Sequence, residues 1–139
     1  MKRPFKDKRI LGPLVELNSA RGSDREFYQE RFTQRMVSAS KQGVGDPIEE
    51  IEYFEDTIEG VPWSKFNDEE RVSIATPAID SIRTVFQISA EQGQISDDKV
   101  VSIVSKFSMI LFERVAGIED ESLASSGLGI IKLDIEEDI

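Results

Sequence analysis

Neither cysteine nor histidine occurs among the 139 residues of the sequence. Without cysteine, the chain has no disulfides, no cysteine nucleophile, no thiolate zinc site and no iron–sulfur cluster. Without histidine, it lacks the Ser-His-Asp triad, the commonest general base near neutral pH and most transition-metal sites. Oxygen ligands remain, and these favour Mg²⁺ or Ca²⁺. We therefore predict a protein that is not an enzyme and that holds no cofactor and no metal.

Long apolar runs are missing as well. No run approaches the roughly 20 residues that a transmembrane helix needs, and the basic N-terminus leads into no apolar stretch. The Walker pattern, the glycine fingerprint of dinucleotide-binding proteins and the EF-hand loop are also absent. We therefore expect one soluble domain without a membrane span or secretory signal, in the cytoplasm, or in the host cytoplasm if the gene is viral.

The charge of the chain is divided unevenly along its length. The formal net charge is −10, yet residues 1–41 hold 10 of the 17 basic residues against 5 acidic ones. The net charges are thus +5 for residues 1–41 and −15 for residues 42–139. Such asymmetry is typical of an interaction arm or tail, but ordinary variation of surface charge gives the same pattern.

Capping signals and apolar residues at helical spacing predict four helices, at residues 23–42, 47–59, 67–92 and 96–116. The predicted N-caps of the last three are Asp46, Asn67 and Ser96, residue types whose side chains accept hydrogen bonds from the free N–H groups of a helix start. Pro77 lies inside the third helix and is predicted to kink it or to split it near Thr76.

The fourth predicted helix is the most apolar stretch of the chain, and we expect it to lie at the centre of the fold. Its apolar surface is wider than one stripe, because Val101, Met109 and Phe112 lie beside the main apolar positions. The sequence leaves open whether this excess faces the core or another subunit.

The two terminal segments differ from the helical part. We divide the chain into a basic N-terminal arm at 1–22, a helical domain at 23–117 and an acidic C-terminal tail or short strand at 118–139. Residues 129–135 are rich in β-branched side chains. They would form a short strand that pairs with residues 14–17. Alternatively, they belong to a tail with a docking motif at Ile131, Leu133 and Ile135. The predicted fold class is all-α with about four helices, and a minor β pair of the terminal segments stays open.

The arm contains the first candidate partner-binding residues, which are Lys2, Arg3, Phe5, Lys6, Lys8 and Arg9. They would contact nucleic-acid phosphates, but the charge of −15 on the rest of the chain would repel a polyanion. The same arm would fit the acidic surface of another subunit, head to tail, and repetition of that contact would build a ring. A nucleic-acid partner is therefore possible but not favoured, and a homo-oligomer is expected.

Trp63 is the only tryptophan and lies in a short loop between two predicted helices. A single tryptophan in such a loop fills a core or, if it is exposed, anchors a partner. We therefore include Trp63 among the candidate partner-binding residues.

The second predicted helix holds the only carboxylate cluster with a helical spacing of interest. Glu49, Glu52 and Asp56 line one side of it and would hold Mg²⁺ through their oxygens, or they form a solvated helix face. No base, nucleophile or phosphate-binding pattern accompanies them, so a Mg²⁺-dependent enzyme is the least favoured interpretation.

These observations favour a non-enzymatic interaction or assembly protein, a self-associating adaptor of viral type that uses its basic arm against an acidic surface. The alternative is an acidic regulator that docks on a nucleic-acid-processing machine, either through acidic surface or through its C-terminal tail.

Overall fold

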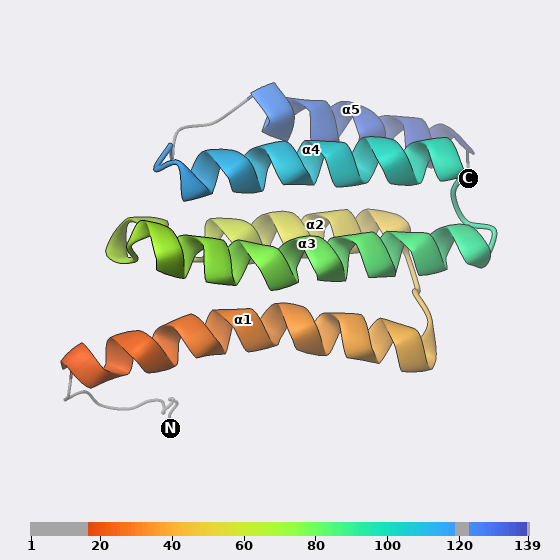
Figure 1. Cartoon of the computed structure of the whole chain (residues 1–139). Coiled ribbons are helices and arrows are strands. Elements are labelled where there is room, and N and C mark those ends of the chain that lie inside the picture. The colour runs from red at the N-terminus through yellow and green to blue at the C-terminus, as the bar shows by residue number, and fades with distance from the viewer. Residues whose placement is uncertain (1–16, 119–122, 139) are drawn as a thin grey trace.

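The computed structural model describes residues 17–118 and 123–138, with side chains described at 24–118 and 127–136. Within these residues it consists of five α-helices and one 3₁₀ turn and contains no strand. The elements, shown in Figure 1, are α1 (Leu17–Gln42), α2 (Pro47–Glu59), η1 (Trp63–Lys65), α3 (Asp68–Glu91), α4 (Asp97–Val115) and α5 (Leu123–Asp138). The all-α prediction is thus confirmed, with one helix more than expected.

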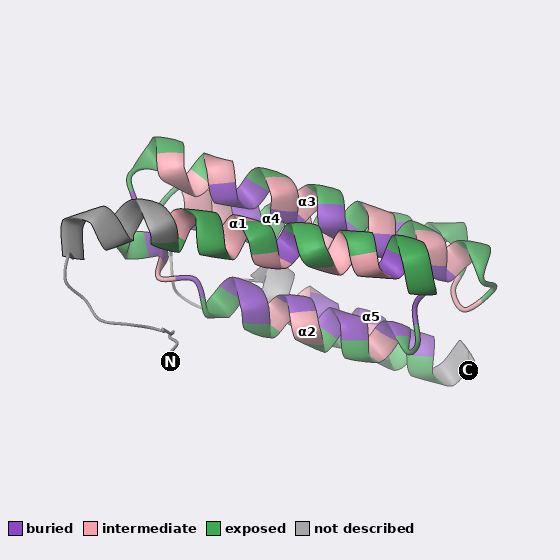
Figure 2. Cartoon of the chain, turned by 90° about the horizontal axis from the view of Figure 1, so that it is seen from below, coloured by how far each residue is buried: buried purple, intermediate pink, exposed green. Residues whose placement is uncertain are grey.

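The helices run along a common direction and form two layers. Helix α3 packs against α1 on one side and against α4 on the other, while α5 packs against α4 and α2. Figure 2 shows α2 and α5 together on one side of α1, α3 and α4. Helices that follow one another in the sequence run in opposite directions, so short connections are sufficient (Figure 1).

Helix starts follow the predicted capping residues. The side chains of Asp46 and Ser96 accept hydrogen bonds from the backbone N–H groups of Ile48 and Lys99, respectively. Asn67 and Glu70 form a reciprocal capping box at the start of α3. These bonds satisfy donors that have no partner within the helix, which explains why α2, α3 and α4 begin where local sequence predicts.

The minor β pair of the terminal segments, which the sequence left open, is not supported by the structure. Residues 129–135 lie within α5, and Leu17 already belongs to α1, while residues 14–16 lie outside the described residues. Leu128, Ile131 and Ile135 are buried, and their spacing of three and four residues places them on one side of a helix. Packing of this side against the bundle outweighs the strand preference of the isoleucines.

Helix α1 begins before the predicted start at residue 23. The boundary between the arm and the helical domain, placed after residue 22, therefore falls inside α1. At the other end, α5 contributes three buried residues to the same core as the other helices. The described part of the predicted tail thus packs as a fifth helix of the bundle.

Pro77 does not split α3, which is continuous from Asp68 to Glu91. A proline has no backbone N–H, so the carbonyl of Ser73, four residues earlier, loses its helical donor. The side-chain amide of Gln29 in α1 donates to this carbonyl, with Nε2 and O 2.8 Å apart. A tertiary contact thus replaces the missing helical hydrogen bond.

Substitution Gln29→Ala should therefore lower the free energy of unfolding by about 1–2 kcal/mol, because the carbonyl of Ser73 loses its replacement donor. In a Pro77→Ala background the alanine N–H can donate to that carbonyl, so the same substitution should cost less. Urea unfolding of the two single variants, the double variant and the wild type measures the coupling. Additive effects of the two substitutions would contradict this role of Gln29.

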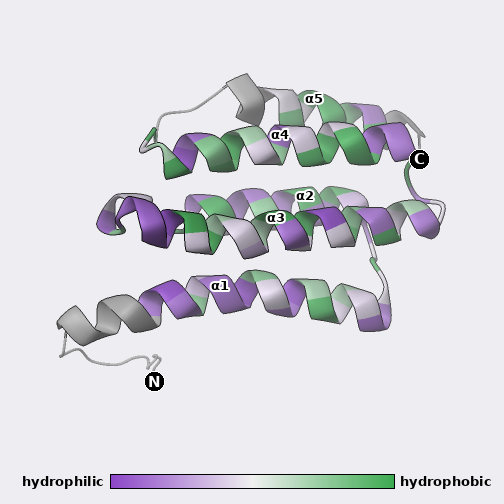
Figure 3. Cartoon of the chain, in the orientation of Figure 1, coloured by the Kyte–Doolittle hydropathy of each residue, from purple (hydrophilic) through white to green (hydrophobic). Residues whose placement is uncertain are grey.

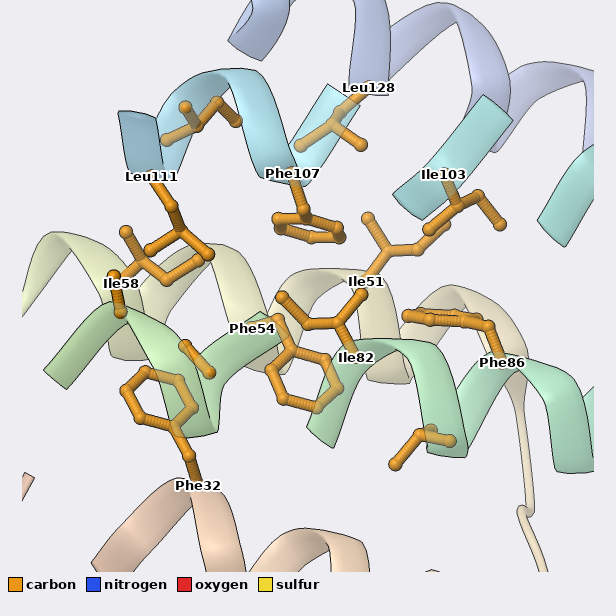
Figure 4. Packing of buried hydrophobic residues seen from close by; sticks show 14 of the residues in the cluster. Phe32, Ile51, Phe54, Ile58, Ile82, Phe86, Ile103, Phe107, Leu111 and Leu128 are labelled. Atoms are coloured by element: carbon orange, nitrogen blue, oxygen red, sulfur yellow. The ribbon is translucent and has the colours of Figure 1, made fainter. Parts of the chain in front are cut away.

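The centre of the core is an aromatic cluster of four phenylalanines, Phe32, Phe54, Phe86 and Phe107. The ring of Phe54 in α2 lies 6.4 Å from that of Phe32 in α1 and 6.1 Å from those of Phe86 in α3 and Phe107 in α4. All four side chains are fully buried, and Figure 4 shows them among the isoleucines and leucines of the core. One residue of the shortest α-helix thus connects three other helices.

Substitution Phe54→Ala is expected to lower the free energy of unfolding by about 3–5 kcal/mol, because the cavity would adjoin three helices. Phe27→Ala is the matched control, since Phe27 is 55% exposed, and should cost less than about 1 kcal/mol. Thermal and urea unfolding measure both values. A similar loss for the two variants would show that the core does not depend on Phe54.

Candidate protein-binding face

Helix α2 turns one side to the core and a row of carboxylates to the solvent. Its buried side includes Ile51, Phe54 and Ile58. All four residues of the exposed row are acidic, namely Glu49, Glu52, Asp56 and Glu59. We call these four residues, together with the half-buried Glu55 and the exposed Glu136 of α5, the acidic face.

Lys132 is the only basic residue in the sequences of α2 and α5. Its Nζ lies 3.1 Å from Oε2 of Glu52, so it joins the two helices across the acidic face. The hydrogen bond to Glu52 raises the pKa of Lys132 most, and the charges of Glu52, Glu55 and Glu136 raise it further. For the six carboxylates of the acidic face, α2 and α5 thus supply a single ammonium group.

Glu55 lies in the middle of this charge distribution. Burial is the largest cause that raises the pKa of its carboxyl above the ordinary value of 4.5. The charge of Lys132 lowers this pKa, and the charges of Glu59, Asp56 and Glu52 raise it. The ionised form of Glu55 is therefore less favourable in the folded chain than in the unfolded chain.

This shift predicts that Glu55 makes the protein less stable as the pH rises. The unfolded chain loses the proton of Glu55 near pH 4.5 and the folded chain loses it at a higher pH, so the free energy of unfolding falls between these values. Glu55→Gln should therefore be more stable than the wild type at pH 7, with a smaller difference at pH 4. Chemical unfolding at both pH values measures this, with Glu30→Gln on α1 as a control for the loss of one negative charge. A larger gain at pH 4 than at pH 7 would contradict the prediction.

The sixth acidic residue of α2, Glu50, has a different role. Glu50 is buried and accepts two hydrogen bonds from the guanidinium of Arg35 in α1, one of them with Nε and Oε1 2.9 Å apart. This hydrogen bond is the main cause that raises the pKa of Arg35. Because the pair is largely shielded from water, the loss of one partner would leave an uncompensated charge. Glu50 therefore fixes α1 against α2 and does not belong to the exposed row.

Several residues selected from the sequence lie in the core. Trp63 is 3% exposed, and its indole N–H donates to the carbonyl of Ile58 over 2.8 Å. Ile131 and Ile135 are also buried, at 7% and 0%. These three side chains are not accessible to a partner in this fold, so as partner-binding residues they are corrected to core residues. Leu133, by contrast, is 61% exposed.

The basic residues of the arm, Lys2, Arg3, Lys6, Lys8 and Arg9, together with Phe5, lie outside the described residues. Their role stays a prediction. Sequence reasoning missed Ile130, which is 64% exposed beside Leu133. A helical period for residues 128–135 would have separated these two outward positions from the inward ones.

The geometry gives the Mg²⁺ interpretation no support. Among the side chains that the structure describes, no group of three acidic residues is arranged to hold a metal ion. Glu49, Glu52 and Asp56 lie along the helix as a row, and Glu52 is bound to Lys132. The acidic face is therefore described best as a charged surface that can attract a basic partner.

Within the described residues, the helices are too short or too polar to cross a bilayer. Comparison of the chain with known protein families, with curated proteins and with solved structures finds no match.

Proposed function

We propose that this chain is a non-enzymatic interaction and assembly protein of the adaptor type, located in the cytoplasm, whose acidic face binds a basic segment. The observation that carries the proposal is the exposed row of α2, in which all four side chains are carboxylates. Residues of one charge on an accessible surface raise the rate and the specificity of association with a partner of opposite charge.

The first nine residues of a second copy are the basic segment that we favour. Residues 1–9 contain five basic side chains and one acidic one. A contact between this segment of one copy and the acidic face of the next uses two different surfaces, so it is head to tail. Such contacts close into a ring or continue as an open chain, depending on the rotation between copies.

An acidic regulator of a nucleic-acid-processing machine is the second candidate, and the same face supports it. A row of carboxylates can occupy a basic cleft that otherwise receives nucleic-acid phosphates. The version in which the C-terminal segment docks has less support, because Ile131 and Ile135 are buried and α5 would have to leave the bundle.

Light scattering after size exclusion, at low salt and at about 1 M NaCl, tests the favoured contact. We expect an oligomer at low salt that dissociates at high salt, where the screening length falls to about 3 Å. Deletion of residues 1–9 and the double variant Glu49→Lys/Asp56→Lys should each give the same dissociation at low salt. Glu26→Lys/Glu30→Lys on α1 is the matched control, since both residues are exposed and lie outside the acidic face.

Persistence of the low-salt oligomer in both the deletion and the α2 double variant would contradict the proposal. If the wild type forms no oligomer sensitive to salt, the arm is not the partner of the acidic face. Binding of the α2 double variant and of the wild type to a basic nucleic-acid-binding protein would then test the regulator.

A further inference from the structure

Helices α3 and α4 form an apolar groove between them, on the layer opposite the acidic face. It has a volume of about 360 Å³, and its lining includes Val72, Ala75 and Ile79 of α3 and Leu111, Phe112 and Val115 of α4. None of the described residues that line it is charged. Val72 is 49% exposed and Phe112 is 75% exposed, and Figure 3 shows hydrophobic residues along most of α4. An uncharged surface with large exposed apolar side chains is typical of a binding groove.

The groove begins at the end of the bundle where α1 starts. Arg71, at the start of α3, donates from Nε to the carbonyl of Val115 at the end of α4 over 3.0 Å. The same guanidinium donates to the carbonyl of Phe66, and the ring of Phe66 lies 6.3 Å from that of Tyr28 in α1. These contacts place the starts of α1 and α3 and the end of α4 together (Figure 1). The 16 residues that precede Leu17 are therefore joined to the bundle at the end where the groove begins.

The distance from the start of α1 to the groove decides which residues can reach it. Gln29 of α1 lies beside Ser73 of α3, so α1 begins at Leu17 about 18 Å before that level, at about 1.5 Å per residue. Because packed helices lie about 8–10 Å apart, the sideways step from α1 across α3 to the groove is about 14 Å. The two components give a path of about 23 Å.

Ile10 and Leu11 are the first apolar residues before α1 that can span this path. They lie six or seven residues before Leu17, and an extended chain of that length spans about 20–25 Å. Leu14 lies three residues before Leu17, and its span of about 10 Å is too short. Pro13 favours extended backbone for itself and for the residue before it, which suits such a reach.

The charges around the groove fit the same segment. Two basic residues come directly before Ile10. Glu69 lies three residues before Val72, on the same side of α3. Glu113 follows Phe112 in α4 and lines the adjoining hollow. An apolar groove with carboxylates at its border thus matches an apolar pair that is preceded by basic residues.

A segment of the same chain has an advantage over a separate partner. A short connection gives it an effective concentration on the order of millimolar, so weak apolar contacts are sufficient for docking. A second copy, by contrast, carries a net charge of −10 and is repelled by the first. Residues 10 and 11 of its own chain are therefore the best match for the groove.

We propose that Ile10 and Leu11 dock in the groove between α3 and α4 of their own chain, with their side chains against Val72 and Phe112. This contact goes beyond the proposed function, because it is apolar, lies within one copy and uses neither residues 1–9 nor the acidic face. It fixes the place from which residues 1–9 continue. That place lies on the layer opposite the acidic face, so the basic segment is held away from the carboxylates of its own copy.

Disulfide trapping in the full chain tests the contact directly, because the sequence has no cysteine. Under a mild oxidant, Leu11→Cys/Val72→Cys should form a disulfide within one chain at least about 10-fold faster than Leu11→Cys/Ser64→Cys. Ser64 is the matched control, since it is exposed in η1, at the same end of the bundle and outside the groove. Equal rates for the two pairs would overturn the proposal. Disulfides between chains as the main product of the first pair would also overturn it, because the groove would then receive a second copy.

Two aspartate substitutions in the first pair test which residues dock. Ile10→Asp should slow the cross-linking to the rate of the control pair, because a carboxylate would enter an apolar groove. Leu14→Asp should leave the rate unchanged, since Leu14 lies too close to the start of α1 to reach the groove. Equal rates for these two variants would overturn the proposal. Both variants keep residues 1–9 and the acidic face intact, so the cross-link and the salt-dependent oligomer test the two proposals separately.

Discussion

The ring of Phe54 contacts aromatic rings of three other helices, and this one side chain determines where α2 lies. Because α2 is surrounded on its apolar side, only its opposite side remains for solvent, and that side carries the carboxylates. The same packing that buries Ile51 and Ile58 therefore aligns Glu49, Glu52, Asp56 and Glu59 in one row. The acidic face is thus a consequence of the core.

Helix α4 lies at the edge of the layer that it forms with α1 and α3, because α3 packs between α1 and α4 (Figure 2). Helix α4 packs against α3 and α5, and within the residues that the structure describes no helix covers Val101, Met109 and Phe112. The expectation that α4 lies at the centre was wrong for this side of the helix. The prediction was based on the number of apolar residues in the helix, whereas the burial of a residue depends on which other helices pack against it. The apolar excess of α4 is therefore exposed on this side of the helix.

The sequence was sufficient to predict those parts of the fold that depend on hydrogen bonds between residues close together in the chain. Asp46, Asn67 and Ser96 act on N–H groups within their own first turn, so the starts of α2, α3 and α4 could be predicted. The continuity of α3 through Pro77 depends on Gln29, which lies 44 residues from Ser73 in the sequence. The helical state of α5 likewise depends on the core that receives Leu128. For the candidate site, the carboxylate row could be predicted from spacing, but the burial of Trp63, Ile131 and Ile135 could not.

The two faces constrain each other through charge. An exposed phenylalanine on a neutral protein favours unspecific association, whereas a strong net charge of one sign keeps copies apart. The acidic face supplies much of that charge, and it lies on the layer opposite the apolar surface of α4 (Figure 2). The charge therefore penalises contacts between copies that would bring their acidic faces together.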